Sequence, residues 1–149
     1  MNVAKETKVR VGEKMIWTPF SEHEHSYLKE IVTAADADAM GIRLSSVLLE
    51  KIDVGGSILP HYHDVSEVIH ITQGNVRVLC NGVWKNNKAG DTFMVPAGEV
   101  HSVCNDDTAP TFQISIFIPT RETTQSNCFF KTFLVNVSSP FKKKSEQSG

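Results

Sequence analysis

Short segments rich in β-branched and aromatic residues, separated by turn signals, follow one another through most of this chain and constrain its fold more than any other feature. No long stretch places apolar residues at helical spacing. Many strands at short, even intervals are typical of a sandwich or a barrel. The sequence therefore predicts an all-β fold. The expected strands are 27–33, 42–54, 57–63, 67–72, 75–80, 83–85, 92–95, 101–105 and 111–118.

Turn-forming residues separate these segments. Asn81-Gly82 is the strongest hairpin signal, because a two-residue type I′ turn needs positive φ at both positions and this pair tolerates it. Gly55-Gly56 and Pro96-Ala97-Gly98 mark further turns. The segment 34–41 is rich in alanine and ends in glycine, so it fits either a short helix or a loop.

Length and composition favour one compact domain spanning 1–149, with a core at about 27–120 and flexible ends at 1–14 and 138–149. A formal net charge of -2 provides no general attraction to nucleic acid or to an anionic membrane. The chain has no apolar stretch of the length that a bilayer requires. Its three cysteines are widely spaced and lack a CxxC pair, which indicates free thiols. We expect a cytoplasmic protein without nucleic-acid or membrane partners.

Two histidines one residue apart are the first sign of chemistry. His61 and His63 flank Tyr62 in an expected strand, and the two-residue period of a strand turns both imidazoles to one face. Glu67 follows a short turn, and His101 follows another; strand periodicity alone leaves open whether these two side chains reach the same pocket. Imidazoles with a carboxylate suit Fe, Mn, Ni, Co, Cu or Zn, whereas Ca and Mg prefer oxygen ligands.

Two longer motifs then point to a known family. The residues Gly55, His61, His63, Glu67 and Gly74 match the first cupin motif, G(X)5HXH(X)3E(X)6G, and Gly90, Pro96, Gly98, His101 and Asn105 match the second, G(X)5PXG(X)2H(X)3N. Over about 42–119 the chain therefore resembles the cupin superfamily. The resemblance implies a double-stranded β-helix, or jelly-roll barrel, that holds one divalent transition metal ion. It implies as ligands His61, His63, Glu67 and His101.

Other candidate residues have plainer expected roles. His23 and His25 form a second HxH pattern in a charged segment, and we expect a solvated surface there. His70 lies three residues after Glu67 and is expected on the outer face of its strand. Cys104 is expected to fill the core and Tyr62 to pack away from the ligands.

The last long strand has two unlike faces. We expect its apolar face to line the core; the alternative places Gln113 and Ser115 inside as polar pocket residues. The apolar face consists of Phe112, Ile114, Ile116 and Ile118. Further residues expected to line the barrel are Leu48, Ile52, Leu59, Ile69, Val78, Phe93 and Val95.

The implied site leaves two positions of an octahedral ion open. We expect a metal-dependent oxygenase acting on a small organic molecule, with Glu67 also taking part in catalysis. The alternatives are a non-redox isomerase, cyclase, lyase or sugar-modifying enzyme that uses the ion as a Lewis acid, and a module that only binds or senses a small ligand. Exposed barrel edges and Ile16, Trp17 and Phe20 predict a homodimer.

Overall fold

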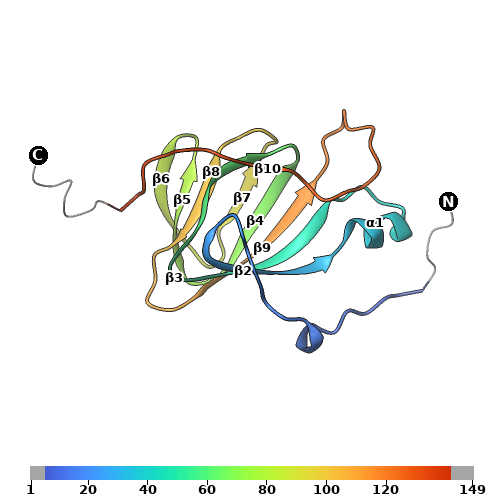
Figure 1. Cartoon of the computed structure of the whole chain (residues 1–149), viewed down its shortest axis with the longest axis horizontal. Coiled ribbons are helices and arrows are strands. Elements are labelled where there is room, and N and C mark those ends of the chain that lie inside the picture. Colours follow the sequence, from blue (N-terminus) through green and yellow to red (C-terminus); the bar gives the residue numbers. More distant parts are fainter. Residues whose placement is uncertain (1–5, 142–149) are drawn as a thin grey trace, which may run out of the picture.

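The computed structural model describes residues 6–141, which form a strongly curled antiparallel sheet with one short helix at one end (Figure 1). The expected all-β, jelly-roll type of fold is confirmed. The elements are a 3-10 turn at Gly12–Lys14, β1 Thr18–Pro19, β2 Glu24–Val32, α1 Ala34–Met40, β3 Ser46–His63, β4 Ser66–Gln73, β5 Asn75–Cys80, β6 Val83–Lys88, β7 Thr92–Val95, β8 His101–Asn105, β9 Thr111–Ile118 and β10 Thr132–Leu134.

Strand β3 organises the sheet. Its first half pairs with β2 and β9, and its second half pairs with β8 and β10. The main path of neighbouring strands runs β6-β5-β8-β3-β9-β4-β7. The two strands expected at 42–54 and 57–63 are therefore one long strand, which passes through Gly55 and Gly56 without breaking. Because β3 is continuous, the strands that pair with its two halves enclose one common interior.

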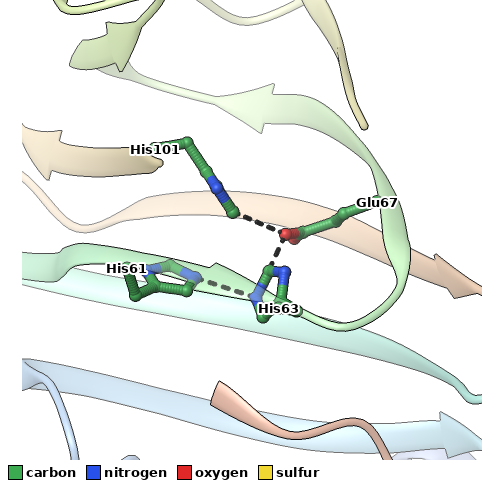
Figure 2. Close-up of side chains that lie close together, drawn as sticks. All are labelled: His61, His63, Glu67 and His101. Carbon is green, nitrogen blue, oxygen red and sulfur yellow. Dashed lines mark hydrogen bonds and ion pairs between the residues drawn. The ribbon is translucent and has the colours of Figure 1, made fainter. Parts of the chain in front are cut away.

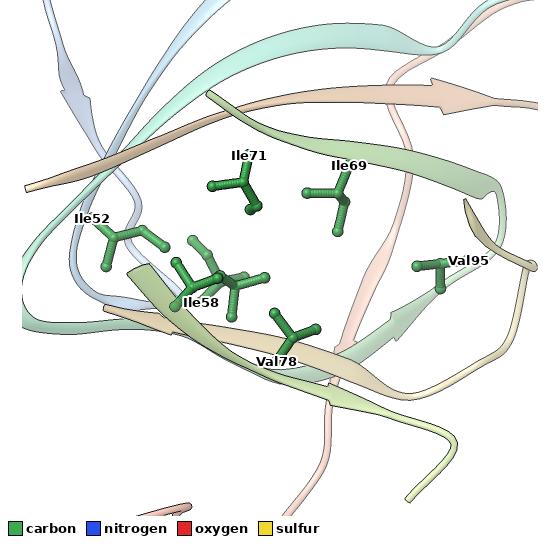
Figure 3. Packing of buried hydrophobic residues seen from close by; sticks show 8 residues of the cluster. Ile52, Ile58, Ile69, Ile71, Val78 and Val95 are labelled. Atoms are coloured by element: carbon green, nitrogen blue, oxygen red, sulfur yellow. The ribbon is translucent and has the colours of Figure 1, made fainter. Parts of the chain in front are cut away.

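The interior contains two groups of buried apolar side chains. The larger group comes from β3, β4, β5, β7 and β8, and Figure 3 shows its side chains pointing toward one another. Its members are Ile52, Ile58, Ile69, Ile71, Val76, Val78, Val95 and Val103. The smaller group consists of Leu48, Val65, Phe117 and Phe130, and Phe20 packs against both groups.

Two expectations about facing are wrong. On β9 the buried residues are Thr111, Gln113, Ser115 and Phe117, so the polar face points inward. The apolar residues expected there face outward, and Trp17 covers part of that side, with its ring centroid 6.0 Å from that of Phe112. On β3, Ile58 is buried and Leu59 is not, because a register shift lies between Ile58 and His61.

The local signals explain the turns and the helix. Asn81 and Gly82 both have positive φ and connect β5 to β6, as the hairpin signal predicts. The segment 34–41, for which the sequence fits either a helix or a loop, forms helix α1 over Ala34–Met40 with Gly41 as its C-cap. Thr33 accepts a hydrogen bond from the backbone N–H of Asp36, and the Asp36 carboxylate accepts one from the backbone N–H of Thr33, forming a capping box.

The ends of the described chain contact the barrel. Lys8 and Arg10 form ion pairs with Asp36, each at 2.7 Å, and Trp84 donates from Nε1 to the carbonyl of Ser138. Strand pairing reaches from β1 to β10, beyond the expected core of 27–120. The remainder of the ends expected to be flexible lies outside the described residues. None of the described helices is long and apolar enough to cross a membrane.

Gly56 provides a test of the packing. A Cβ atom built there would lie 2.6 Å from the backbone oxygen of His25 and 2.8 Å from that of Glu24. We expect Gly56→Ala to lower the free energy of unfolding by about 1–3 kcal/mol, because backbone must shift to relieve this overlap. Gly12→Ala is the control, since its Cβ would meet nothing within 4 Å. Urea denaturation of both variants is the measurement, and equal stabilities would contradict this account.

Candidate metal centre

Four polar side chains converge inside the barrel. His61 and His63 come from β3, Glu67 from β4 and His101 from β8, and each is only 3–4% exposed. One ligand atom from each lies within 4.8 Å of those of the others. Figure 2 shows the three imidazoles and the carboxylate directed at a common point. The structure thus brings together all four residues that the sequence predicts as ligands.

An irregularity in β3 turns the two histidines inward. Its buried residues are at even positions up to Ile58, apart from the exposed Val54, and at odd positions from His61 onward. Leu59 and Pro60 lie within the register shift between these two residues, and neither directs its side chain inward. Such a bulge tolerates proline, which has no N–H to contribute to the ladder. The bulge therefore allows both Ile58 and the HxH pair to face the interior.

The partner strands supply the other two donors. His101 lies directly opposite His61 in the β3–β8 pairing. Its Nε2 is 2.9 Å from Oε1 of Glu67, and Nε2 of His63 is 3.6 Å from the same oxygen. The Nε2 atoms of His61 and His63 are 2.8 Å apart. All three imidazoles therefore present Nε2 to the centre.

Backbone carbonyls orient two of these imidazoles. His61 donates from Nδ1 to the carbonyl of Leu59 at 2.6 Å, and His101 donates from Nδ1 to the carbonyl of Glu99 at 2.9 Å. A neutral imidazole protonated at Nδ1 has a lone pair at Nε2, which is the form that binds a metal. In that form Nε2 of His101 and the carboxylate of Glu67 both face each other as acceptors. Only a further proton or a cation between them makes this arrangement favourable, so the donor set fits a divalent transition ion.

The environment keeps two of the histidines neutral. Burial, followed by the neighbouring histidines, lowers the pKa of His61 to about 2. Burial likewise lowers the pKa of His63 to about 4, against the opposing effect of Glu67. Burial also lowers the pKa of His101, but the hydrogen bond and charge of Glu67 outweigh it and leave the pKa raised. A bound cation would take the place of the His101 proton that Glu67 stabilises.

The centre opens into a small, mostly apolar cavity. Inside it the centre of a water molecule has about 20 Å³ in which to move, which is room for about one water molecule or ion. Phe117 and Phe130 are stacked, with centroids 3.8 Å apart, and both contact the ring of His63 edge-on. An organic substrate therefore requires side chains such as Phe130 to move.

His23 belongs to this cavity, so its expected place on a solvated surface is wrong. Its ring lies 5.1 Å from that of His61, and its Nδ1 accepts a hydrogen bond from the backbone N–H of Leu59 at 3.0 Å. The neutral ring therefore carries its proton at Nε2. Burial lowers the pKa of His23 to about 4. His25 is exposed, as expected.

Two further polar residues in the cavity were missed or left open by the sequence. Glu50 on β3 and Gln113 on β9 both line it, and Nε2 of Gln113 donates to Oε2 of Glu50 at 3.1 Å. The prediction from sequence includes Gln113 only as an alternative and does not include Glu50. The alternation of buried residues from Ser46 to Ile52 is the signal that places Glu50 inside.

The remaining candidates lie away from the centre. His70 faces outward and its Nδ1 is 2.8 Å from Oγ1 of Thr92, and Tyr62 stacks on Phe133. Cys104 is buried in the core, as expected. Of the three residues expected to pair subunits, Ile16 is 80% exposed, whereas Trp17 and Phe20 pack within the chain. The homodimer stays a prediction.

Comparisons with known proteins agree with this architecture. The polyketide cyclase RemF from Streptomyces resistomycificus superposes with a TM-score of 0.69 at 14% identity, covering 89% of this chain and 88% of that one. A predicted oxalate decarboxylase from Thermotoga maritima gives 0.67 at 20% identity, covering 76% and 100%. KdgF from Halomonas sp. gives 0.61 at 20% identity, covering 75% and 94%. At these identities the likeness concerns the fold alone.

The sequence comparison identifies the family. No curated protein sequence matches the chain significantly. Residues 48–117 match the family model of the cupin domain, and this segment contains all four of the converging side chains. Residues 48–117 therefore form a cupin domain, which is built around the buried cluster of three histidines and one glutamate.

Proposed function

We propose that this protein is a metal-dependent enzyme acting on a small organic molecule held in the barrel. The observation that carries the proposal is the convergence of four buried donors, two of them held by backbone carbonyls in the metal-binding tautomer. His61, His63, Glu67 and His101 would hold one divalent transition ion and leave two octahedral positions open. Glu67 is the one anionic ligand, and we also assign it a role in catalysis.

The first assignment is an oxygenase. A redox-active ion with two open positions supplies a place for an organic ligand and dioxygen side by side. The chain's own contribution is the wall of Ile58, Val103 and Phe117, which excludes water and holds the substrate, together with His23 as a hydrogen-bond donor at Nε2. This combination of a coordinated centre and an apolar wall supports the assignment.

A second assignment, a non-redox isomerase, cyclase, lyase or sugar-modifying enzyme, is favoured by one specific observation. Glu50 is a buried carboxyl group that lines the same cavity and does not belong to the ligand set. Lewis-acid chemistry on a carbonyl compound requires such a proton-exchanging group next to the ion. Redox chemistry has less need of it.

The ligand set is tested by removing one imidazole. We expect His101→Ala to weaken zinc affinity by at least about 100-fold, because it deletes a donor and leaves Glu67 without its hydrogen-bond partner. His70→Ala removes a histidine from the outer face and is expected to leave zinc affinity unchanged. Competition with a chromogenic chelator measures both affinities. Equal losses of zinc affinity in the two variants, or no loss in His101→Ala, would show that the metal centre lies elsewhere.

Acid should empty the site. The pKa values of His61 and His63 are lowered by burial to about 2 and 4, while the unfolded chain protonates its histidines near 6.5. Between these values the unfolded state binds more protons, so each such buried histidine removes about 1.4 kcal/mol of stability per unit fall in pH. The raised pKa of Glu50 has the opposite sign but involves a single group.

We therefore expect the melting temperature of the metal-free protein to fall as the pH drops from about 6.5 toward 4.5, and bound metal to be lost on dialysis near pH 4. Differential scanning calorimetry and elemental analysis are the measurements. A melting temperature that stays constant or rises over this pH range would contradict the burial of neutral histidines.

The two enzyme assignments differ in their need for oxygen. We expect the iron-loaded protein to consume dioxygen with at least one member of a panel of enolic and catecholic compounds, measured with an oxygen electrode. The zinc-loaded protein is the matched control and should consume none, because zinc has no accessible redox change. Turnover by the zinc protein under nitrogen, with no oxygen uptake by the iron protein, would replace the oxygenase with the non-redox assignment.

A further inference from the structure

Glu50 is the buried titratable group that the proposed ligand set leaves unused. It is 3% exposed and lies on the inward face of β3 between Leu48 and Ile52, both fully buried. Its hydrogen-bond partner is the amide of Gln113. No lysine or arginine is among the described residues that line the cavity. In the metal-free protein a carboxylate placed there loses its hydration without gaining a cation, which disfavours its charged form.

Several other titratable groups line the cavity together with Glu50. They are Glu67 on β4, His101 on β8, His61 and His63 on the second half of β3, and His23 next to β2. Burial, and then the charge of Glu67, raise the pKa of Glu50 to about 8. Ser115, buried on the inward face of β9, and Gln113 oppose this rise in the pKa of Glu50.

We propose that Glu50 is the acid–base residue of this centre and that the substrate is a small carbonyl compound with an acidic α-hydrogen. The inference rests on the proposed metal-dependent function and specifies its substrate class. Glu50 and the proposed ligands line one cavity, so a carbonyl compound held at the ion lies against the Glu50 carboxyl group. Gln113 holds that carboxyl group in place through its hydrogen bond to Oε2.

The proton transfer balances without a further reagent. The α-carbon–hydrogen bond of the substrate breaks, its electron pair stays on the substrate as an enolate, and the proton forms a new O–H bond on Glu50. Return of a proton from Glu50 to the α-carbon exchanges that hydrogen with solvent. Return to the far carbon of a conjugated enolate instead moves a double bond. Glu50 ends each cycle as it began, and nothing is oxidised or reduced.

A structural role for Glu50 would have a different signature. If the side chain only completed a hydrogen bond with Gln113, a glutamine at this position would serve equally well and would not titrate. Glu50→Gln therefore separates the two roles while keeping the size of the side chain. Glu50→Asp keeps the carboxyl group and serves as the rescue variant. Glu30→Gln is the matched control, since Glu30 is a half-buried carboxylate on β2 bonded to Ser46 outside the cavity.

The experiment loads wild type and the three variants with zinc and follows loss of the α-hydrogen signal of β-keto acids and hydroxyketones in D2O by NMR. Zinc content is measured in parallel. We expect all four proteins to bind zinc. Exchange should fall at least about 100-fold in Glu50→Gln, recover in part in Glu50→Asp, and stay at the wild-type rate in Glu30→Gln.

A second readout needs no activity. Infrared difference spectra of the metal-free protein should show the carbonyl band of a protonated carboxylic acid that disappears with a midpoint near pH 8. The band should be present in Glu30→Gln and absent in Glu50→Gln. A band that has already disappeared by pH 6 in the wild type would overturn the proposal.

The outcomes separate this inference from the function on which it rests. Failure of the wild type to bind zinc would overturn the proposed metal-dependent function itself. Zinc binding with unchanged exchange in Glu50→Gln would overturn only the role of Glu50. Zinc binding without exchange of any compound by the wild type would overturn both the role and the substrate class.

Discussion

The burial of three imidazoles and a carboxylate inside an apolar barrel is the constraint on which the rest of this structure depends. Polar groups are stable there only if each has a partner. The bulge in β3 meets this requirement for two rings, because the peptide groups of Leu59 donate to His23 and accept from His61. The carbonyl of Glu99 does the same for His101. Backbone groups therefore set the direction of the Nε2 atoms before any ion or substrate is considered.

The cavity that results is polar on one side and apolar on the other. Phe117, Phe130 and Ile58 exclude water, which strengthens every electrostatic interaction among the groups they enclose. In this setting Glu67 and Glu50 behave differently. Glu67 lies 2.9 Å from Nε2 of His101 and 3.6 Å from Nε2 of His63, whereas Glu50 accepts a hydrogen bond from the amide of Gln113. Two carboxyl groups in one cavity are thus suited to two tasks, ligation and proton exchange.

The outward face of β9 shows why hydrophobicity alone misled the prediction of facing. Phe112, Ile114 and Ile116 are more apolar than Gln113 and Ser115, so they were expected inside. The interior of this barrel contains a partly polar cavity as well as an apolar core, and Gln113 bonds there to Glu50. Trp17, held over Phe112 and contacted by Lys29 and Lys51, covers part of the outer face instead. Trp17, which is distant from β9 in the sequence, thus allows the apolar residues of β9 to face outward and the polar ones to face inward.

The sequence by itself determined the all-β fold class, the Asn81-Gly82 hairpin and the identities of the four converging side chains. These depend on turn chemistry, on the spacing of short strands and on residue spacing within two short motifs. Only the tertiary structure decided that His23 and Glu50 share the cavity and that Leu59 does not line it. His23 enters from a segment preceding β2. Glu50 shares the inward face with His61 and His63 because β3 continues through Gly56 and shifts register after Ile58. Such effects depend on contacts between strands far apart in the chain, which no local pattern records.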